Sequence, residues 1–297
     1  MKLKVLEETG IRIDKYLALN TDYSREYISK LIETNYILVN GSAVKSSYKV
    51  KENDEILIND ELKKDTTLKE EDISLDIVYE DDDLLVINKP SGLVVHPGNG
   101  NHEHTMVNAL LHHTKDLSDN FGVERAGIVH RLDKDTSGLM IAVKTNKAHE
   151  ILADDFKNKR VKREYLALIH GVFPSASAKI DAPIGRSKKD FRKMEVVKDG
   201  KKAVTNLKVV KRYKKYTLVR LSLETGRTHQ IRCHMEYIGY PVFNDPVYSK
   251  DKATSFGQFL HSASLDFIHP ITKEKMHFEA DIPLEFKEFL INLEKEI

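Results

Sequence analysis

The sequence predicts an α+β fold in two parts, a small N-terminal α/β module and a larger domain on a mixed, largely antiparallel sheet. Three observations support this prediction. Two helical patterns precede a hairpin signal at the start, strand-like runs with few βαβ repeats dominate the rest, and a polar stretch separates the two parts. We expect domains at residues 1–62 and 75–297, joined by a flexible linker at residues 63–74.

The N-terminal module, residues 11–58, contains two short amphipathic patterns that predict helices. Ser24 precedes the second pattern and is expected to be its N-cap. The segment "YILVNGSAV" follows, in which Asn40 and Gly41 form the dipeptide of a tight hairpin turn. The polar sides of the predicted helices carry four basic residues: Arg12, Lys15, Arg25 and Lys30.

The larger domain begins with "LDIVYEDDDLLVINKPSG", two strand-like runs around an acidic turn. A helical pattern begins at Thr105, a buried strand is expected over residues 139–144, and Asn146 is placed as the cap of the next helix. The segments "EYLALIHG" and "AVTNLKVVKRYKKYTLVRLSLE" then indicate a strand and a hairpin. A last helical pattern covers residues 228–238, and Gly239 ends it.

The charge of the chain is balanced overall but uneven along its length. The net charge of +1 argues against a protein that coats nucleic acid through its total positive charge. Residues 186–215 nevertheless hold 13 Lys or Arg and three acidic residues. Taken alone, such a run is most simply a solvated hairpin.

The cysteine content and the apolar segments indicate the cellular compartment of the protein. Cys233 is the single cysteine, which excludes an intramolecular disulfide and a cysteine-rich zinc site and is typical of a reducing compartment. The first residues, MKLKVLEETG, contain no apolar signal segment, and no run of about 18 apolar residues occurs. We therefore expect a cytoplasmic protein without membrane association.

The polar segment "HRLDKDTSG", residues 130–138, interrupts two apolar runs. One interpretation is a structural turn, since its aspartates, threonine and serine are good turn formers. That interpretation leaves Arg131 without a role, because a long cationic arm beside such a loop usually seeks an anion. A second interpretation is the D-x-D-x-T start of haloacid-dehalogenase-like phosphatases, which use Asp133, Asp135 and Mg²⁺. That motif belongs after the first strand of a βαβ fold, whereas here it lies among hairpins.

Five segments occur in the order found in RluA-type pseudouridine synthases, and together they span roughly residues 75–285. The N-terminal helix pair with its "VNG" hairpin resembles the S4 RNA-binding domain, so the chain is most similar to the RluD-like branch that modifies ribosomal RNA. One departure is "FNDPVY", where Asn244 stands for the family's usual glycine and can adopt the same turn conformation. The five segments are "INKPSGLVVHPG", "GIVHRLDKDTSGLMIAVKT", "REYLALIHG", "LETGRTHQIRCHMEYIGYPVFNDPVY" and "FLHSASLDFIHP".

This resemblance implies an enzyme that isomerises uridine in RNA by breaking the N-glycosidic bond, rotating the uracil and joining C5 to C1′. It implies that Asp133 is the catalytic carboxylate, which attacks C1′, attacks the base or removes a sugar proton. It implies that Arg232 forms a salt bridge with Asp133 and keeps it ionised, because burial alone would raise the pKa of the carboxyl. It also implies that Arg131 helps to flip the target base and that Tyr165 stacks on it. The reaction requires no metal, redox group or nucleotide cofactor.

Five further residues are expected to support the site without reacting: His130, Asp135, Gly226, Arg227 and His229. The two histidines lack metal-ligand spacing and are expected to hold the catalytic loop by hydrogen bonds. Asp135 is expected to brace that loop through its carboxylate. Gly226 and Thr228 are expected to shape the turn and cap of the helix that carries Arg232.

The expected partner is structured RNA, either 23S-type ribosomal RNA or a ribosomal precursor particle. The basic helices of the N-terminal module and residues 186–215 would bind its phosphates and supply affinity without reading bases. Two rival functions stay open: an RNA-binding ribosome-assembly factor without catalysis, and the Mg²⁺-dependent phosphatase. The presence of Asp133, Tyr165 and Arg232 together argues against the first rival, and dependence on a metal would reveal the second.

Overall fold

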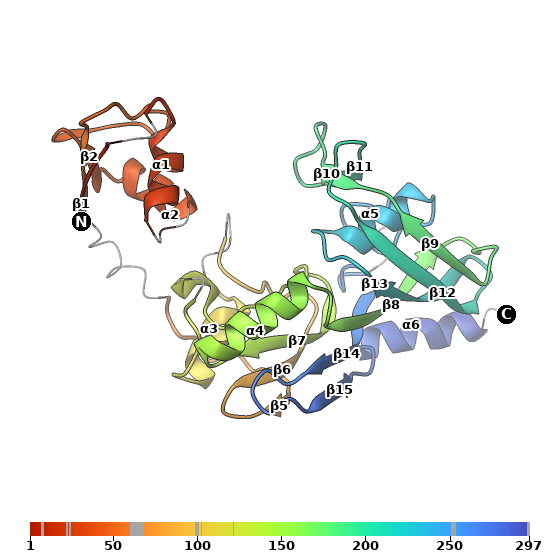
Figure 1. Ribbon diagram of the computed structural model, residues 1–297. Helices are drawn as coiled ribbons and strands as arrows, with labels where there is room; N and C mark the ends of the chain where they lie inside the picture. Colours follow the sequence, from red (N-terminus) through yellow and green to blue (C-terminus); the bar gives the residue numbers. More distant parts are fainter. Residues whose placement is uncertain are drawn as a thin grey trace. The chain divides into compact units, whose positions relative to one another are not determined.

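The computed structural model describes residues 1–6, 9–21, 23, 25–59, 68–98, 101, 103–120, 122–250 and 254–295; for residues 25, 26, 30 and 123 it describes the backbone alone. The chain divides into two compact units, Met1–Thr67 and Leu68–Ile297 (Figure 1). The predicted N-cap Ser24 and residues 63–67 of the predicted linker lie outside the described residues. Among the helices of the described residues, none is long and apolar enough to cross a membrane.

The first unit is a small antiparallel sheet with two helices, as the sequence predicts. The strand order is β1-β4-β2-β3, and Asn40 and Gly41 both have positive φ, 50° and 78°, at the tight turn between β2 and β3. Apolar side chains of both helices pack into one core with the sheet. The elements are β1 Lys2–Lys4, α1 Ile13–Asn20, α2 Arg25–Glu33, β2 Ile37–Val39, β3 Ser42–Ala43 and β4 Glu55–Ile58.

The second unit is built on a nine-stranded mixed sheet in the order β5-β6-β7-β14-β8-β13-β12-β9, with β15 beside β14. The pair β7 and β14 is parallel, and its neighbours are antiparallel, which confirms the predicted α+β class. The strands of this sheet are β5 Ile77–Glu80, β6 Leu84–Lys89, β7 Ser137–Val143, β8 Lys162–His170, β9 Ser177–Asp181, β12 Val204–Arg212, β13 Tyr216–Leu223, β14 Leu260–Ile268 and β15 Lys275–Glu279.

The remaining elements of the second unit cover the sheet or extend from it. A two-stranded ribbon, β10–β11, projects beyond the large sheet (Figure 1). These elements are α3 Met106–His113, a 3₁₀ turn at Val123–Arg125, α4 Asn146–Lys157, β10 Ile184–Arg186, β11 Met194–Val196, α5 Gln230–Tyr237 and α6 Leu284–Lys295.

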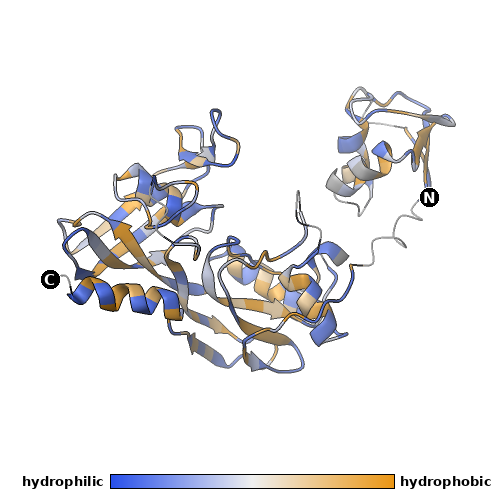
Figure 2. Cartoon of the chain, turned by 180° about the vertical axis from the view of Figure 1, so that it is seen from behind, coloured by the Kyte–Doolittle hydropathy of each residue, from blue (hydrophilic) through white to orange (hydrophobic). Residues whose placement is uncertain are grey.

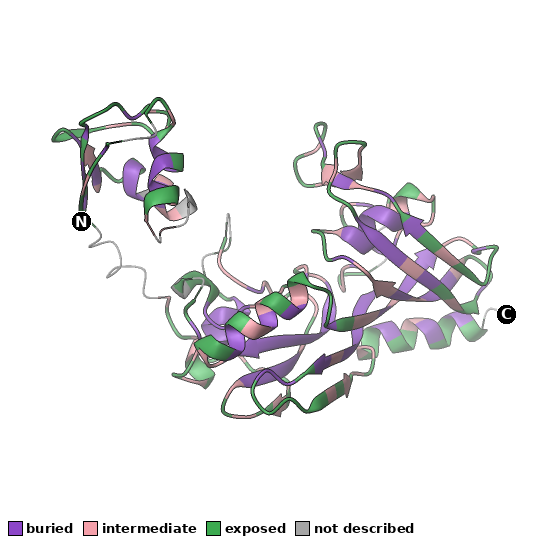
Figure 3. Ribbon diagram, viewed as in Figure 1, coloured by how far each residue is buried: buried purple, intermediate pink, exposed green. Residues whose placement is uncertain are grey.

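Strand β7 is buried along its whole length (Figure 3), which explains the continuous apolar run after the polar loop. Its alternate side chains reach two separate cores. Met140 and Ala142 pack in the cluster that contains α3 and α5 residues, whereas Leu139 and Ile141 pack with Leu152 of α4. Helix α6 completes a further cluster with β8 and β13. The polar loop before β7 is therefore attached to the most buried strand of the unit.

Gly138 is required where β7 meets β14. Its φ is 107°, and a Cβ at this position would lie 2.3 Å from the carbonyl oxygen of Ser262. No side chain fits so close to a neighbouring backbone. The glycine that ends the polar segment thus allows the parallel pairing of His261 with Ser137 and of Ser262 with Gly138.

Three local expectations differ from the structure. Thr145, not Asn146, is the N-cap of α4, and its hydroxyl accepts a hydrogen bond from the backbone N–H of Ala148. Helix α5 covers Gln230–Tyr237, shorter than the predicted 228–238, because His229 is the N-cap, in the left-handed conformation with φ 54°. Thr228 therefore does not cap this helix.

Residues 68–74 of the predicted linker belong to the second unit. The backbone N–H of Glu71 donates to the carbonyl of Asn108 in α3 at 3.0 Å, and the Asn108 amide donates to the carbonyl of Lys69 at 2.8 Å. The carboxylate of Glu71 also accepts the backbone N–H of His104 at 2.8 Å. Composition alone does not reveal these contacts, because they are made mainly by backbone groups and polar side chains.

Candidate active site

The loop of residues 129–136 carries the candidate catalytic residue Asp133 and is held at three points. His130 Nε2 accepts the backbone N–H of Ile141 at 2.9 Å, and its ring stacks on Phe156. The hydroxyl of Thr136 accepts a hydrogen bond from Gln258 at 2.9 Å. Burial, with the nearby Arg163 cation, lowers the pKa of His130 to about 3, so its ring is neutral and acts as a fixed acceptor.

Lys89 is the third attachment point of this loop. The side chain is fully buried, and Nζ donates to the carbonyls of Pro90, Leu93 and Lys134 at 2.8–2.9 Å. Burial lowers the pKa of Lys89 to about 7, although Asp135 and Asp133 partly offset the effect. The ammonium thus joins the "NKPSG" turn to the loop through backbone acceptors.

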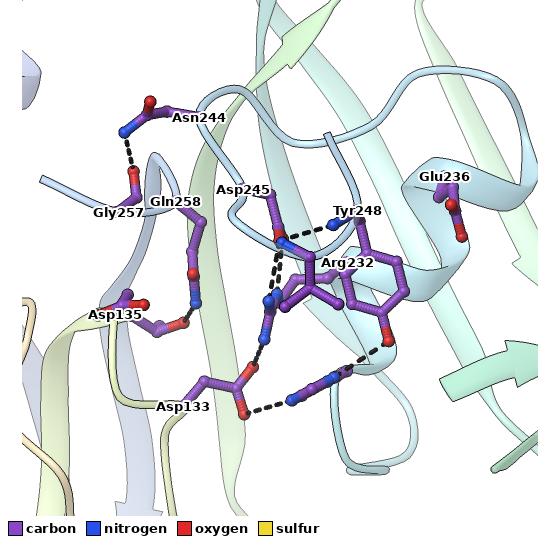
Figure 4. Close-up of polar contacts among 12 residues, drawn as sticks. Asp133, Asp135, Arg232, Glu236, Asn244, Asp245, Tyr248, Gly257 and Gln258 are labelled. Atoms are coloured by element: carbon purple, nitrogen blue, oxygen red, sulfur yellow. Dashed lines mark hydrogen bonds and ion pairs between the residues drawn. The ribbon is translucent and has the colours of Figure 1, made fainter. Parts of the chain in front are cut away.

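Asp133 is paired with Arg232, as the resemblance implies. Arg232 Nη1 donates to Asp133 Oδ2 at 2.9 Å, and the other edge of the guanidinium donates to both oxygens of Asp245 at 2.6 and 2.8 Å (Figure 4). Arg232 and Asp245 are buried, whereas the Asp133 side chain is 20% exposed. A bidentate carboxylate therefore fixes the orientation of the arginine that faces Asp133.

A histidine and a tyrosine complete this network. His229 Nε2 lies 3.8 Å from Asp133 Oδ1, and His229 Nδ1 lies 3.0 Å from the Tyr248 hydroxyl. The guanidinium of Arg232 lies over the Tyr248 ring, 5.0 Å from its centroid. The left-handed backbone of His229 places its ring between the carboxylate and the phenol. The side-chain hydrogen bond of His229 is thus made to Tyr248, and its ring lies near Asp133 without the hydrogen bond to the catalytic loop that the sequence analysis expects.

The charges of the network keep Asp133 ionised. Burial alone would raise the pKa of the Asp133 carboxyl, but the charges of His229 and Arg232, the hydrogen bond from Arg232 and the charge of Arg131 outweigh burial and lower it. Burial alone would lower the pKa of Arg232, and the two carboxylates instead raise it. Burial also lowers the pKa of His229, and the neighbouring Asp133 carboxylate partly offsets this effect. The site therefore presents one anionic oxygen pair beside a fixed cation.

A pocket of about 540 Å³ opens beside Asp133. Tyr165 reaches it from the middle of the sheet, where β8 lies between β13 and β14, and its side chain is largely buried. The predicted site residues that line the pocket are His130, Arg131, Asp133, Tyr165, Gly226, Arg227, His229 and Arg232. These predicted residues come from three separate segments of the sequence, at residues 130–133, 165 and 226–232, and meet at one cavity.

Some predicted residues have other surroundings. Asp135 does not line the pocket, and Ser91 donates to its backbone carbonyl at 3.0 Å. Its carboxylate makes no hydrogen bond with the described residues, so the expected bracing runs through the main chain instead. Arg227 contributes its backbone N–H to Gln230 Oε1 and its side chain to the carbonyl of Lys202.

The predicted phosphate-binding residues fall in two places. Arg131 is exposed at the pocket, with Nη1 3.2 Å from His96 Nε2. Arg12 and Lys15 are exposed on the first unit, where Arg12 pairs with Asp14 at 3.0 Å. The side chains of Arg25 and Lys30 lie outside what the structure describes.

The sequence prediction missed three residues of the site: Lys89, Asp245 and Tyr248. Each stands within a quoted family segment, but Asp245 precedes a proline and suggests a turn, and Tyr248 suggests a core aromatic. The local sequence gives no signal for a lysine that binds three carbonyls.

Among the described residues, Asp81, Asp83 and His269 form a group that could hold a metal ion. Several of their polar atoms already have hydrogen-bond partners within the protein. Asp81 accepts from the Tyr79 hydroxyl and from the backbone N–H of Asp83, and His269 Nε2 lies 2.9 Å from Asp81. These residues do not line the pocket.

Comparison with known proteins agrees with this geometry. A family model for RNA pseudouridylate synthase matches residues 83–237, and a model for the S4 domain matches residues 11–56. An uncharacterized RNA pseudouridine synthase of Bacillus subtilis, YlyB, is 47% identical, covering 97% of this chain and 96% of that protein. Ribosomal large subunit pseudouridine synthase D of Zymomonas mobilis is 42% identical, covering 95% of this chain and 93% of that protein. The structure of human RNA pseudouridylate synthase domain containing 1 shares the fold, with a TM-score of 0.59 and 24% identity over 74% of this chain and 95% of that chain. The chain therefore belongs to the RNA pseudouridylate synthase family, with an S4 domain before its catalytic region.

Proposed function

We propose that this chain converts uridine to pseudouridine in large-subunit ribosomal RNA, with Asp133 as the essential carboxylate. The observation that carries the proposal is the pair of Asp133 and Arg232, 2.9 Å apart at the wall of a pocket. The ribosomal substrate is supported by relatives named ribosomal large subunit pseudouridine synthase D, which align with nearly the whole chain. Such a substrate, free or in a precursor particle, supports a cytoplasmic location as part of the same proposal.

The reaction breaks the N1–C1′ bond and forms the C5–C1′ bond, while N1 gains a proton and C5 loses one to solvent. We assign to Asp133 the contact with the reacting nucleotide and to Arg232 the positioning of that carboxylate. The pocket volume lies in the range typical of small-ligand sites, so it suits one extruded nucleotide. Tyr165 would stack on the uracil, and Arg131 would bind a flanking phosphate.

The first unit is proposed to be a separate RNA-binding domain. Lys15 and Arg12 are exposed there and can contact phosphate, although the ion pair with Asp14 reduces the charge that Arg12 offers. Arg25 and Lys30 belong to the same proposal on sequence grounds alone. We place the boundary with the catalytic domain at Leu68, since the residues that follow it contact α3.

The test is release of tritium from C5-labelled uridine in a transcript of 23S ribosomal RNA, with and without EDTA. We expect release by the wild-type protein in both conditions. Absence of release on every ribosomal RNA transcript would overturn the proposed reaction. The phosphatase alternative instead predicts no tritium release and a release of phosphate from a phosphoester substrate that EDTA abolishes. In that alternative both aspartates act on one phosphoryl group, whereas here Asp133 lines the pocket and Asp135 does not.

A further inference from the structure

An exposed aromatic side chain stands at the end of the β10–β11 ribbon. Phe191 is 78% exposed, the largest value among the large apolar residues that the structure describes. A single exposed apolar residue is common on protein surfaces. Phe191, however, stands in a loop that is otherwise hydrophilic (Figure 2), and packing within the protein does not account for an apolar ring exposed to this degree.

The turn that carries Phe191 is held firmly by hydrogen bonds. The Ser187 hydroxyl, itself buried, accepts the backbone N–H groups of Lys189 and Asp190. The Asp190 carboxylate accepts the backbone N–H and the guanidinium of Arg192 at 2.9–3.1 Å. The backbone on both sides of Phe191 is therefore fixed while its ring faces solvent. An aromatic ring on a fixed backbone has only two side-chain torsions to order, so it loses little conformational entropy when it binds a partner.

The charge around Phe191 indicates the nature of that partner. Residues 186–193 contain five basic residues and one acidic residue. Arg192 is paired with Asp190, and Lys193 with Glu236 of α5. Lys188 and Lys189 are exposed, and neither forms an ion pair with the residues described. An aromatic ring beside unpaired cations is suited to a nucleic-acid base flanked by phosphates.

The base of the ribbon is tied to the candidate active site. The Tyr248 hydroxyl contacts the backbone N–H of Met194 at 2.7 Å and its carbonyl at 3.2 Å, and it also lies 3.0 Å from His229 Nδ1. Helix α5, which carries Arg232 to the pocket, packs against β11. The ribbon and helix α5 thus form one connected structure. An RNA bound at the pocket would therefore lie near the ribbon as well as near Arg232.

We propose that Phe191 stacks on an unpaired base of the RNA substrate, outside the pocket, while Lys188 and Lys189 contact the phosphates beside that base. This inference rests on the proposed function for the identity of the RNA. It adds a second contact that binds a nucleotide other than the one that reacts. Stacking requires an unpaired base, so the contact favours a loop or bulge near the modified uridine.

The chain contains no tryptophan, which allows a direct test. Phe191→Trp introduces a single tryptophan that can still stack and can be excited selectively, and Leu284→Trp places a matched control at a residue 66% exposed at the start of α6. Each full-length variant is titrated with the 23S ribosomal RNA transcript and with short oligouridine. We expect RNA to quench the fluorescence at position 191 and to leave that at position 284 unchanged. Equal behaviour of the two fluorophores would overturn the proposal.

The second measurement is the affinity of Phe191→Ala for the same transcript. Loss of one base–aromatic stack predicts a Kd about tenfold higher with an unchanged turnover number at saturating RNA, and Phe191→Tyr should restore the affinity. An unchanged Kd for Phe191→Ala would overturn the stacking role.

Tritium release by the wild-type protein separates the two proposals. If release occurs but Phe191 has no effect, the ribbon inference fails alone. Quenching without any release means that the proposed reaction fails and the RNA contact stands.

Discussion

The candidate active site and the β10–β11 ribbon both depend on charged residues but hold them in opposite ways. At the site, Lys89, Arg232 and Asp245 are buried, and each has fixed hydrogen-bond partners at 2.6–2.9 Å. At the ribbon, Lys188 and Lys189 are exposed and form no ion pair with the residues described. The burial of charge is costly unless each group is paired, whereas exposed charge costs little and is screened by salt.

This difference separates two tasks. Buried, paired charges hold one carboxylate at a defined place and protonation state, so a change in one of them alters the chemistry or the fold. Exposed charges add affinity for phosphates that falls as salt rises, so a change in one of them alters binding by a small amount. The variants below test this separation, from the largest expected effect to the smallest.

Asp133→Asn should have the largest effect. The change keeps the shape of the side chain but removes the carboxylate that the reaction needs, so we expect tritium release to fall by more than about a thousandfold. Folding and RNA affinity should persist, and circular dichroism and a binding titration check both. Asp135→Asn is the matched control in the same loop, because Asp135 does not line the pocket. Substantial release by Asp133→Asn would contradict the assignment.

Arg232→Met should come next. The methionine keeps much of the bulk, but Asp133 and Asp245 both lose their guanidinium partner. We expect turnover to collapse, because the pKa of Asp133 is held low by the surrounding cations and should rise without Arg232. Any residual activity should therefore be lost at a higher pH than in the wild type as the medium is acidified. A pH profile of single-turnover rates checks this, and an unshifted acidic limb would mean that Arg232 does not control the carboxylate.

Lys89→Met should act on stability. Three backbone carbonyls lose their donor, at about 1 kcal/mol each, so we expect about 3 kcal/mol less free energy of unfolding. The pKa of Lys89 also predicts how the stability of the wild-type protein changes with pH. The folded pKa of about 7 lies below the unfolded value of 10.5, so the unfolded state binds more protons between these values and wild-type stability should rise with pH there.

Denaturant unfolding of both proteins across that pH window measures this contribution. We expect the slope that Lys89 contributes to disappear in the methionine variant. Ser91→Ala serves as a comparison that removes a neighbouring loop contact without a titrating group. If both proteins show the same pH dependence, Lys89 does not titrate as described.

Moving the N-terminal boundary of the catalytic domain should have a smaller effect on stability. A fragment of residues 68–297 keeps the contacts of Lys69 and Glu71 with Asn108, whereas a fragment of residues 75–297 loses them. We expect the longer fragment to be more stable by about 1–3 kcal/mol, since the side-chain NH2 and the main-chain carbonyl of Asn108 otherwise lose these partners. Thermal unfolding of the two fragments measures the difference. Equal stability would support the linker boundary that the sequence predicts.

The sequence predicted features that depend on a few neighbouring residues. The turn at Asn40 and Gly41 and the left-handed Asn244 follow from residue types that tolerate positive φ. The α+β class followed from the many hairpin signals. Strand β14 was harder to place, because its parallel partner β7 is distant in the sequence and nothing local encodes the pairing.

The pairing of Asp133 with Arg232 was predicted only through the family resemblance. These residues are 99 positions apart, and no periodicity relates them. Asp245 was missed because an aspartate before proline is typical of turns, and Lys89 because a lysine is rarely fully buried. The residues that orient the catalytic groups are thus less visible than the groups themselves, since their roles depend on tertiary contacts.

The smallest effect is expected at the ribbon. Replacement of Lys188 and Lys189 by alanine removes two exposed charges that have no ion-pair partner among the described residues, and leaves the Ser187 and Asp190 turn intact. If each lysine contacts one phosphate of an unpaired segment, the slope of log Kd against log salt should decrease by about 0.7 per lysine. The affinity should therefore fall a few fold at low salt and converge with that of the wild type at high salt. Turnover at saturating RNA should not change, because no buried partner is disturbed. Lys287→Ala, at an exposed lysine of α6, is the control that should leave the slope as it is. A loss of turnover in the ribbon variant would show that exposed and buried charges are not separable in this protein.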